Sequence, residues 1–345
     1  MNKILSFVVP SYNCEKYLDK CLKSFLNKEV MDKFEVIIIN DGSTDSTKDI
    51  ANSYCEEYPD TFRTIYQENQ GHGGALNTGC SIAKGKYIKA IDADDWVETK
   101  NLPKFISLLE NCDSDVVLTH YYVRNILTGI IQKWKSYPNE FNKNYSMEEI
   151  MSNWKSFDRT LTYHGITYNT NFYKENSIKL STHVFYEDNE FATIPCCYAK
   201  TIMPFDIFIY DYRIGDSNQS VSDKKQIEKI SDAEKVIYRL SNEFSKLKIS
   251  EENLGRDYFI MKAQSVLINY FTVVMLLNKN KKSGRKMGKK MMSNLNSTFP
   301  ELYSIVKRKY IIFRLMNYLH INKKTWDKIQ ASTVYNFLRS NHKFD

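Results

Sequence analysis

The chain has 345 residues, a length sufficient for two or three packed units. Of these residues 42% are hydrophobic and 14% aromatic, a composition that excludes disorder throughout the chain. Its net charge of +7 is unevenly spread: residues 221–345 carry 25 Lys and Arg against 11 Asp and Glu (+14), and residues 1–220 carry 23 against 30 (−7). An acidic front and a basic back predict two parts with different partners, unless the basic part is simply a helical surface facing water.

The seven cysteines include no C-x-x-C pair, which argues against a zinc site or a secreted disulfide framework. Reduced thiols predict a cytoplasmic protein. The apolar start, 4–9, is cut short by Pro10, so it is interpreted as a strand and not as a secretion signal. The apolar stretch 259–277 has polar residues along its length and is predicted to be a core helix, not a membrane span.

The first hundred residues alternate between β-type runs and segments with helical spacing of apolar residues. The predicted strands are 4–9, 34–39, 62–66 and 86–91, and the predicted helices are 15–26, 43–58 and 75–83. Short links between them predict an α/β fold with a mixed, mainly parallel sheet and helices on both faces. Ligands bind such sheets at the carboxyl ends of the strands.

The remainder of the chain is less regular and then becomes helical. Residues 101–222 contain a helix near 102–109 and further β-type runs, which predict a continuation of the same sheet. From about 224 onward no strand alternation occurs, so 223–345 is predicted to be a basic, all-helical C-terminal region, with the two helices after 300 shorter than those before. Three divisions are expected: 1–100, 101–222 and 223–345.

An acidic cluster, Asp92, Asp94 and Asp95, directly follows the fourth predicted strand. Carboxylates this close repel one another unless water or a cation offsets their charge. Oxygen ligands suit a hard cation, Mg²⁺ or Mn²⁺, which can stabilise a diphosphate leaving group. The same residues also suit an acidic turn before a helix, so the spacing alone leaves both interpretations open.

Two more motifs are expected at the same edge. Asp41 precedes Gly42 and can accept a hydrogen bond from a base, or act as a turn aspartate. The loop 67–74 contains three glycines, which allow close approach of a ligand to the backbone, and the helix after it can direct N–H groups toward phosphate. Each motif is weak evidence by itself.

Four blocks, V-V-P-S-Y-N, I-I-I-N-D-G-S-T-D, Q-E-N-Q-G-H-G-G-A-L-N-T-G and G-K-Y-I-K-A-I-D-A-D-D-W, occur in that order. Together they resemble the inverting glycosyltransferases of family 2, which have a GT-A fold. The resemblance implies a nucleotide-sugar donor, most commonly a UDP-sugar. It implies that the donor pocket is lined by Pro10, Tyr12, Asn13, Asp41, Asn69 and Asn77, and that Asp92 and Asp94 contact ribose and metal.

The resemblance also implies a catalytic base. An E-D pair about a hundred residues after the acidic cluster supplies it, which here makes Asp188 the base and Glu187 its neighbour. The acidic residues at this position also favour the start of a helix. Arg213, in a Y-x-Y-R segment, is implied to bind the diphosphate. Relatives often place a metal-binding His nearby, but this chain has none between His183 and His320, which leaves Asp216, Gln219 or water as the last ligand.

Two histidines are candidates for the acceptor side. His164 lies between the two halves of the predicted sheet, and His72 lies within the glycine loop. A lone histidine is more often structural, and this alternative stays open for both.

The segment 279–292 holds seven basic residues. It can contact an anionic membrane surface, contact an anionic acceptor, or form a basic turn in water. No nucleic-acid-binding module accompanies the charge. The C-terminal helices also offer a route to a homo-oligomer.

The sequence therefore predicts a metal-dependent (Mn²⁺ or Mg²⁺) inverting glycosyltransferase. It would move a sugar from a nucleotide diphosphate to a hydroxyl of a surface glycan, teichoic acid, glycolipid or glycoprotein, in the cytoplasm or on the inner face of the membrane. The alternative is a catalytically silent protein that binds nucleotide-sugar or glycan on the same fold.

Overall fold

The computed structural model describes residues 3–176, 179–216, 223–246 and 255–331. The chain divides into two units: one comprises Met1–Gln219 and Leu247–Phe259, and the other comprises Ser220–Lys246 and Ile260–Asp345.

The first unit is built on one nine-stranded sheet. Its strands are β1 (Leu5–Ser11), β2 (Phe34–Asp41), β3 (Phe62–Gln67), β4 (Tyr87–Ala90), β5 (Trp96–Val97), β6 (Val116–Asn125), β7 (Ile131–Trp134), β8 (Ile166–Asn169) and β9 (Ile202–Ile214). The strand order is β3-β2-β1-β4-β8-β6-β9-β5, with β7 paired to β6. Strands β1 to β4 run parallel, whereas β8 pairs antiparallel with both β4 and β6. The expected mixed sheet is confirmed.

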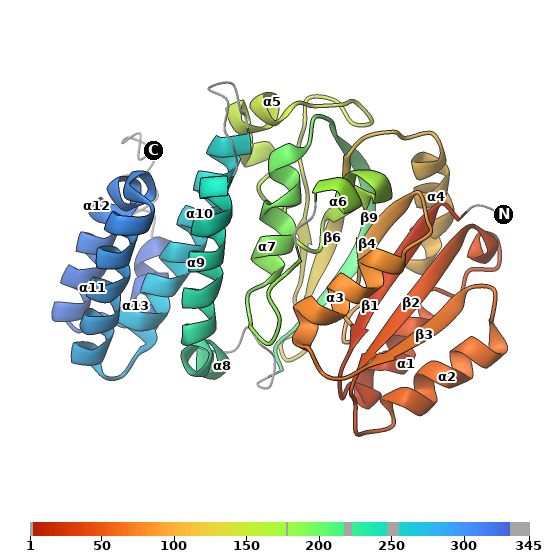
Figure 1. Ribbon diagram of the computed structural model, residues 1–345, viewed down its shortest axis with the longest axis horizontal. Coiled ribbons are helices and arrows are strands. Elements are labelled where there is room, and N and C mark those ends of the chain that lie inside the picture. The colour runs from red at the N-terminus through yellow and green to blue at the C-terminus, as the bar shows by residue number, and fades with distance from the viewer. Residues whose placement is uncertain (1–2, 177–178, 217–222, 247–254, 332–345) are drawn as a thin grey trace. The chain divides into compact units, whose positions relative to one another are not determined.

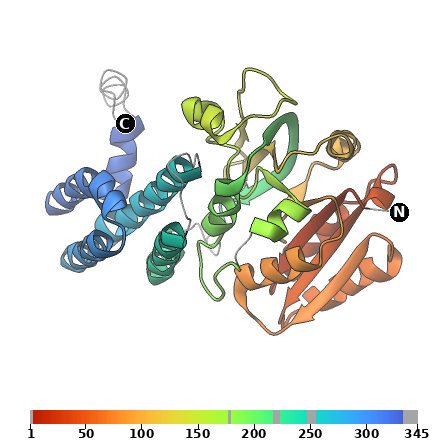
Figure 2. The same ribbon diagram turned by 45° about the horizontal axis from the view of Figure 1, so that its top comes forward.

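Helices cover both faces of this sheet (Figures 1 and 2). They are α1 (Glu15–Lys23), α2 (Thr47–Glu57), α3 (Gly71–Ile82), α4 (Leu102–Glu110), α5 (Met147–Ser152), α6 (Thr170–Asn176) and α7 (Asp188–Thr193). Successive residues of a strand point to opposite faces. In β1, accordingly, the Phe7 ring packs against Phe25 just beyond α1, while Val8 meets Gly79 of α3. The fully buried β1 and β2 form the centre of the core.

Within the described residues the second unit is helical, as predicted. Its helices are α8 (Asp223–Glu228), α9 (Ile230–Lys246), the second-unit part of α10 (Gly255–Phe271) with its π-helical continuation Thr272–Leu277, α11 (Lys281–Thr298), α12 (Pro300–Tyr318) and α13 (Lys323–Ala331). The expectation that both helices after residue 300 are short is wrong for α12, whose 19 residues exceed the 18 of α11. Its spaced buried residues, from Leu302 to Met316, extend the packed face over the whole helix.

One helix among the described residues, Gly255–Leu277, is long and apolar enough to cross a membrane by length and composition. Leu267, Tyr270 and Phe271 of this helix are nevertheless fully buried within the protein. The Tyr270 hydroxyl donates to the carboxylate of Glu234 on α9 over 2.6 Å. This burial favours the core helix that the sequence predicts.

Candidate functional site

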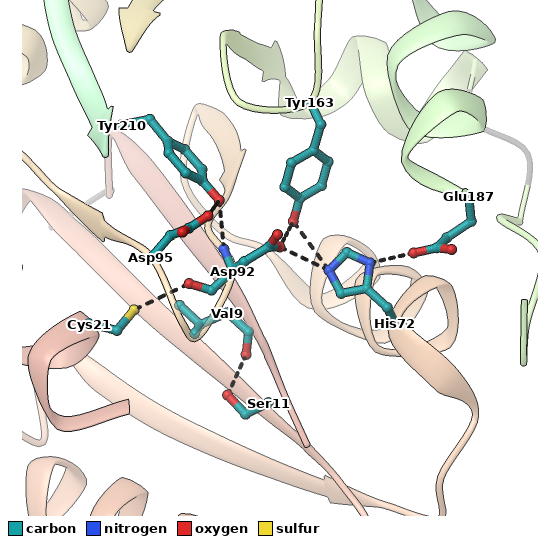
Figure 3. Close-up of polar contacts among 9 residues, drawn as sticks. All are labelled: Val9, Ser11, Cys21, His72, Asp92, Asp95, Tyr163, Glu187 and Tyr210. Carbon is teal, nitrogen blue, oxygen red and sulfur yellow. Dashed lines mark hydrogen bonds and ion pairs between the residues drawn. The ribbon is translucent and has the colours of Figure 1, made fainter. Parts of the chain in front are cut away.

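The acidic cluster lies just beyond β4, at the edge of the sheet where β1 and β2 also end. Asp92 is its most connected member (Figure 3). Its Oδ1 accepts from the Tyr163 hydroxyl at 2.7 Å and lies 3.0 Å from His72 Nε2. Its backbone N–H donates to the Tyr210 hydroxyl. These contacts hold one carboxylate oxygen firmly in place.

His72 joins this aspartate to a residue 115 positions later in the chain. Its Nδ1 lies 2.6 Å from Glu187 Oε1, so the imidazole bridges Asp92 and Glu187 (Figure 3). Burial lowers the pKa of His72, but the two carboxylates outweigh it and raise the pKa well above its usual value. For Asp92, burial alone would raise the pKa, but the positive charge of His72 and the hydrogen bonds from His72 and Tyr163 outweigh burial and lower it overall. The imidazole of His72 is therefore positively charged and lies between the carboxylates of Asp92 and Glu187.

Asp95 is buried and has different partners. The Tyr210 hydroxyl donates to Oδ2 at 2.6 Å, and the backbone N–H of Arg213 donates to Oδ1 at 2.7 Å. Burial, together with the charges of Asp94 and Asp92, raises the pKa of Asp95 well above its usual value. Two neighbouring aspartates thus occupy environments that shift their pKa values in opposite directions.

Asp94 is partly exposed and faces Arg213. The guanidinium lies 3.7 Å from Asp94 Oδ2 and 3.1 Å from Asp216 Oδ2. It also stacks 4.3 Å from the centre of the Tyr17 ring, and the Tyr17 hydroxyl donates to Asp216. Arg213 is therefore fixed beside the acidic cluster, and its binding of the diphosphate stays a prediction. Gln219 lies outside the described residues.

A cation fits the acidic cluster on the chemistry of its donors. One ligand atom from each of Asp92, Asp95 and His164 lies within 4.8 Å of the others. Burial lowers the pKa of His164 to about 4, which leaves a neutral imidazole that can donate a lone pair. The sequence placed His164 on the acceptor side and Asp94 among the ligands. The geometry thus makes His164 a candidate nitrogen ligand, in a chain that has no histidine between His183 and His320.

Asp188 begins α7, as an acidic helix start would. Its side chain is partly exposed, whereas the neighbouring Glu187 is buried. Burial and the charge of Glu187 raise the pKa of Asp188 to about 6, although the positive charge of His72 acts against this. Asn189 donates a hydrogen bond to Asp188 Oδ1 at 3.0 Å. A carboxylate with such a pKa is suited to accept a proton near neutral pH.

The predicted base-binding aspartate, Asp41, ends β2 and is buried. Its Oδ1 accepts from Gln67 Nε2 and from the backbone of Gln70, at 2.7 and 2.8 Å. Asn69 donates to the backbone carbonyl of Asp41. The loop 67–70 is thereby tied to the end of β2, so Asp41 and Asn69 lie together as predicted for one pocket.

The residues after β1 lie at the same edge. Pro10 is buried in the strand, and Tyr12 beyond it is 53% exposed. Asn13 adopts φ of 47°, a conformation that asparagine tolerates, and its Oδ1 accepts from the backbone of Thr44. This contact connects the β1 and β2 loops and leaves the Tyr12 ring open to a ligand.

Asn77 lies apart from these residues. Its amide donates to the Leu180 carbonyl and accepts from the Leu180 N–H, at 3.0 and 2.8 Å. Both functions of the side chain are thus used to hold the segment near 180 against α3. A contact of Asn77 with the nucleotide-sugar, which the resemblance implies, stays a prediction.

The glycines of the loop have a different role from the one expected. Helix α3 begins at Gly71, so the prediction that this helix begins at residue 75, after a loop over 67–74, is wrong. A Cβ on Gly73 would come within 2.2 Å of the Ser181 carbonyl, and one on Gly71 within 2.9 Å of the His183 nitrogen. The absence of side chains therefore lets the chain's own segment 181–183 pack on α3.

Gly73→Ala should destabilise the first unit by about 1–3 kcal/mol, because the new methyl group collides with backbone that cannot move freely. Alanine otherwise favours a helix by up to about 1 kcal/mol over glycine, so a loss would have to come from packing. Urea unfolding followed by circular dichroism measures it. Ser81→Ala, exposed on the same helix, is the control and should not lower stability. Unchanged stability of the Gly73 variant would contradict the packing role.

Two tyrosines of the site, Tyr163 and Tyr210, were not predicted as site residues. Both are buried, and their hydroxyls hold Asp92 and Asp95 (Figure 3). The sequence offered only a weak signal: each lies in a motif already noted, beside His164 and before Arg213. Buried tyrosines are usually core residues, so only the contact identifies them.

Comparisons with known proteins agree with this geometry. The family model Glycosyl transferase family 2 matches residues 6–174. The chain is 37% identical over 142 residues to the putative glycosyltransferase EpsH of Bacillus subtilis, covering 39% of this chain and 40% of EpsH. It is 37% identical over 123 residues to chondroitin synthase of Escherichia coli, covering 35% and 17% of the two chains. The matches thus span about 40% or less of these relatives' own length.

Solved structures extend the likeness of the fold. TarS 1–349 of S. aureus in complex with UDP-GlcNAc superposes with a TM-score of 0.62 at 18% identity, covering 91% of this chain and 89% of that one. The mannosyltransferase PcManGT of Pyrobaculum calidifontis, with GDP-Man and Mn²⁺, gives 0.52 at 15% identity, covering 95% and 88%. The expected GT-A fold is confirmed. The four motifs at one edge of this sheet all fall within residues 6–174, the part of the chain that matches glycosyl transferase family 2.

Proposed function

We propose that this chain is a metal-dependent inverting glycosyltransferase that moves a sugar from a nucleotide diphosphate to an acceptor hydroxyl. The observation that carries the proposal is a pair of aspartates, Asp92 beyond β4 and Asp188 at the start of α7, whose pKa values shift in opposite directions and whose segments His72 joins through Asp92 and Glu187. Asp92 has a lowered pKa and stays ionised, whereas the pKa of Asp188 is raised to about 6. Carboxylates whose environments separate their pKa values typically divide the work of binding charge and moving protons.

In the proposed reaction Asp188 accepts the proton of the acceptor hydroxyl. The acceptor oxygen forms a bond to the anomeric carbon as the bond from that carbon to the diphosphate breaks. Attack opposite the leaving group inverts the configuration. A bound Mn²⁺ or Mg²⁺, held by Asp92 with Asp94 or with Asp95 and His164, would offset charge on the diphosphate. Arg213 adds a fixed positive charge beside it.

The donor and acceptor are proposed from similarity and chemistry. TarS is solved with UDP-GlcNAc and PcManGT with GDP-Man, and a UDP-sugar is the donor we favour. Relatives named as glycosyltransferases and chondroitin synthases support a surface glycan, teichoic acid, glycolipid or glycoprotein acceptor. A cytoplasmic location, on the inner face of the membrane, is part of the same proposal.

The pH dependence of transfer follows from Asp188. The ionised form is the base, and its pKa is raised from 3.8 to about 6, so kcat/KM should rise through about pH 6 and level off above it. Initial rates with the preferred donor, at constant ionic strength, give the profile. Circular dichroism over the same range separates titration from unfolding. A flat profile from about pH 5 to about pH 7 would contradict this assignment of the base.

A donor screen tests the proposal as a whole. Purified chain is incubated with a panel of UDP-, GDP- and other nucleotide-sugars with Mn²⁺, with Mg²⁺ or with chelator, and hydrolysis and binding are both measured. We expect one donor to be hydrolysed in the presence of metal and spared in chelator. Binding with no turnover would support the silent binding protein, and neither binding nor turnover would sink both.

A further inference from the structure

The second unit carries a strong local excess of positive charge. From Ile260 to Trp326 the sequence holds 14 Lys and Arg and one acidic residue, Glu301. Helix α11 contains six of these basic residues and no carboxylate. Oppositely charged pairs one turn apart, which usually stabilise an exposed helix, are therefore impossible within α11. Like charges kept this close favour an anionic partner.

Several of these basic residues line a cavity. Helices α11 and α12 pack side by side (Figure 1), and a cavity of about 560 Å³ is lined by residues from both. Of its nine lining residues, all in the described part of the chain, five are basic and none is Asp or Glu. These five are Lys282, Arg285, Lys286, Lys289 and Arg314. Lys282, Lys286 and Lys289 are exposed.

The wall of the cavity includes side chains that are held in place by contacts within the protein, besides the exposed lysines. Arg285 donates to Asn317 Oδ1 at 2.6 Å, and Asn317 is fully buried and donates in turn to the Met275 carbonyl. The same guanidinium stacks 4.3 Å from the centre of the Tyr318 ring. A hydrogen bond from Arg314 and the nearby positive charges lower the pKa of Tyr318. Arg285 therefore has a fixed orientation in the wall of the cavity, held by Asn317 and the Tyr318 ring.

An exposed apolar face lies on the same helix as part of the cavity wall. On α12 the buried side includes Leu302, Val306 and Phe313. Leu315 and the C-cap residue Leu319, one turn apart and away from that side, are 56% and 71% exposed. Ile311 and Ile312, about one turn earlier, are large hydrophobic side chains that are exposed as well. Apolar side chains clustered beside basic ones are typical of helices that lie in a membrane interface.

We propose that the surface formed by α11 and α12 docks on an anionic lipid bilayer, with lipid phosphates in the cavity and the exposed apolar residues of α12 in the headgroup layer. Charge complementarity favours the bilayer over a second copy of the chain, whose identical basic face would be repelled. A water-soluble phosphate polymer would match the cations but leave Leu315 and Leu319 exposed. The proposal goes beyond the proposed transfer reaction, for which the residues named above all lie in the first unit.

Vesicle sedimentation tests this inference with the full chain. Vesicles of phosphatidylcholine alone are compared with vesicles that also contain phosphatidylglycerol, at low and at high salt. We expect binding only to the anionic vesicles, and release at high salt. Binding that is equal for both lipids, or that resists salt, would indicate insertion through an apolar helix such as Gly255–Leu277 and would overturn the proposal.

Two variants separate charge from apolar contact. Lys286→Ser with Lys289→Ser should weaken binding to anionic vesicles roughly 30-fold. Leu315→Ser with Leu319→Ser should weaken it roughly tenfold or more. The matched control, Lys28→Ser with Lys104→Ser, removes two exposed lysines from the first unit and should bind as the parent does. Circular dichroism and donor hydrolysis in solution show that each variant is folded.

Three outcomes would overturn the inference. If the control variant binds anionic vesicles as weakly as the Lys286 and Lys289 variant does, binding depends on the net charge of the protein and not on this surface. A dimer in light scattering that disappears in the leucine variant, without vesicle binding, would assign the surface to a second copy. Binding of soluble glycerophosphoglycerol as tight as binding of vesicles would make the cavity a site for a soluble phosphate ligand.

Discussion

Asp188→Asn is expected to lower the rate of sugar transfer by roughly 10²- to 10⁴-fold, the range that a positioned general base contributes. The amide has the same shape and can still accept the hydrogen bond from Asn189, but it cannot take a proton from the acceptor. Removing a carboxylate beside Glu187 relieves repulsion, so thermal unfolding should not occur at a lower temperature. Steady-state transfer and donor affinity, measured by calorimetry, separate chemistry from binding.

The matched control is Asp113→Asn, because the side chain of Asp113 is 92% exposed on the same unit. This variant should transfer sugar at the parental rate. Donor affinity should be nearly unchanged in the Asp188 variant. If donor affinity falls as much as transfer does, Asp188 holds the donor and is not the base.

Asp94→Asn is expected to have the second large effect, on binding and not on proton transfer. Loss of a carboxylate ligand should weaken Mn²⁺-dependent donor binding by roughly 10- to 100-fold, as removal of a charged contact usually does. In chelator the parent and the variant should bind donor alike, because affinities for metal and donor are linked. Calorimetry with UDP at several Mn²⁺ concentrations measures both affinities.

Two further variants show which residues hold the metal. Asp216→Asn removes the other carboxylate that pairs with Arg213, so it tests whether Asp94 acts only through that guanidinium. His164→Gln removes the nitrogen that lies with Asp92 and Asp95. If Mn²⁺ dependence survives in the Asp94 variant and is lost in the His164 variant, the ligand set is Asp92, Asp95 and His164.

Much of the first unit follows from the sequence because its signals are local. Each of the first four strands is a short apolar run, and in each case the polar motif comes directly after the strand. Parallel strands place their carboxyl ends at one edge, so the sequence alone brings Asp41 and the acidic cluster to the same side of the sheet. The raised pKa of Asp188 and its place at the start of α7 also agree with the E-D motif.

Tertiary structure decided the partners of these residues. His72 meets Glu187 across 115 residues, and Tyr163 meets Asp92 across 71, because β8 is inserted beside β4 and reverses the direction of the sheet. The spacing of motifs along the chain does not predict that strand order. The same reversal brings His164 to Asp92 and Asp95, a contact that a search for histidine near Arg213 could not find.

The glycine loop shows the same division. The sequence predicted close approach of a ligand to the backbone there, since glycine has no side chain in the way. Which surface approaches depends on the fold, and it is the chain's own segment 181–183. The sequence by itself thus determined the resemblance to family 2 over the matched part of the chain, the ends of the first four strands and the identity of the acidic residues. Only the tertiary structure decided which distant side chains form hydrogen bonds with these acidic residues and shift their pKa values, because those contacts depend on strand order and on burial.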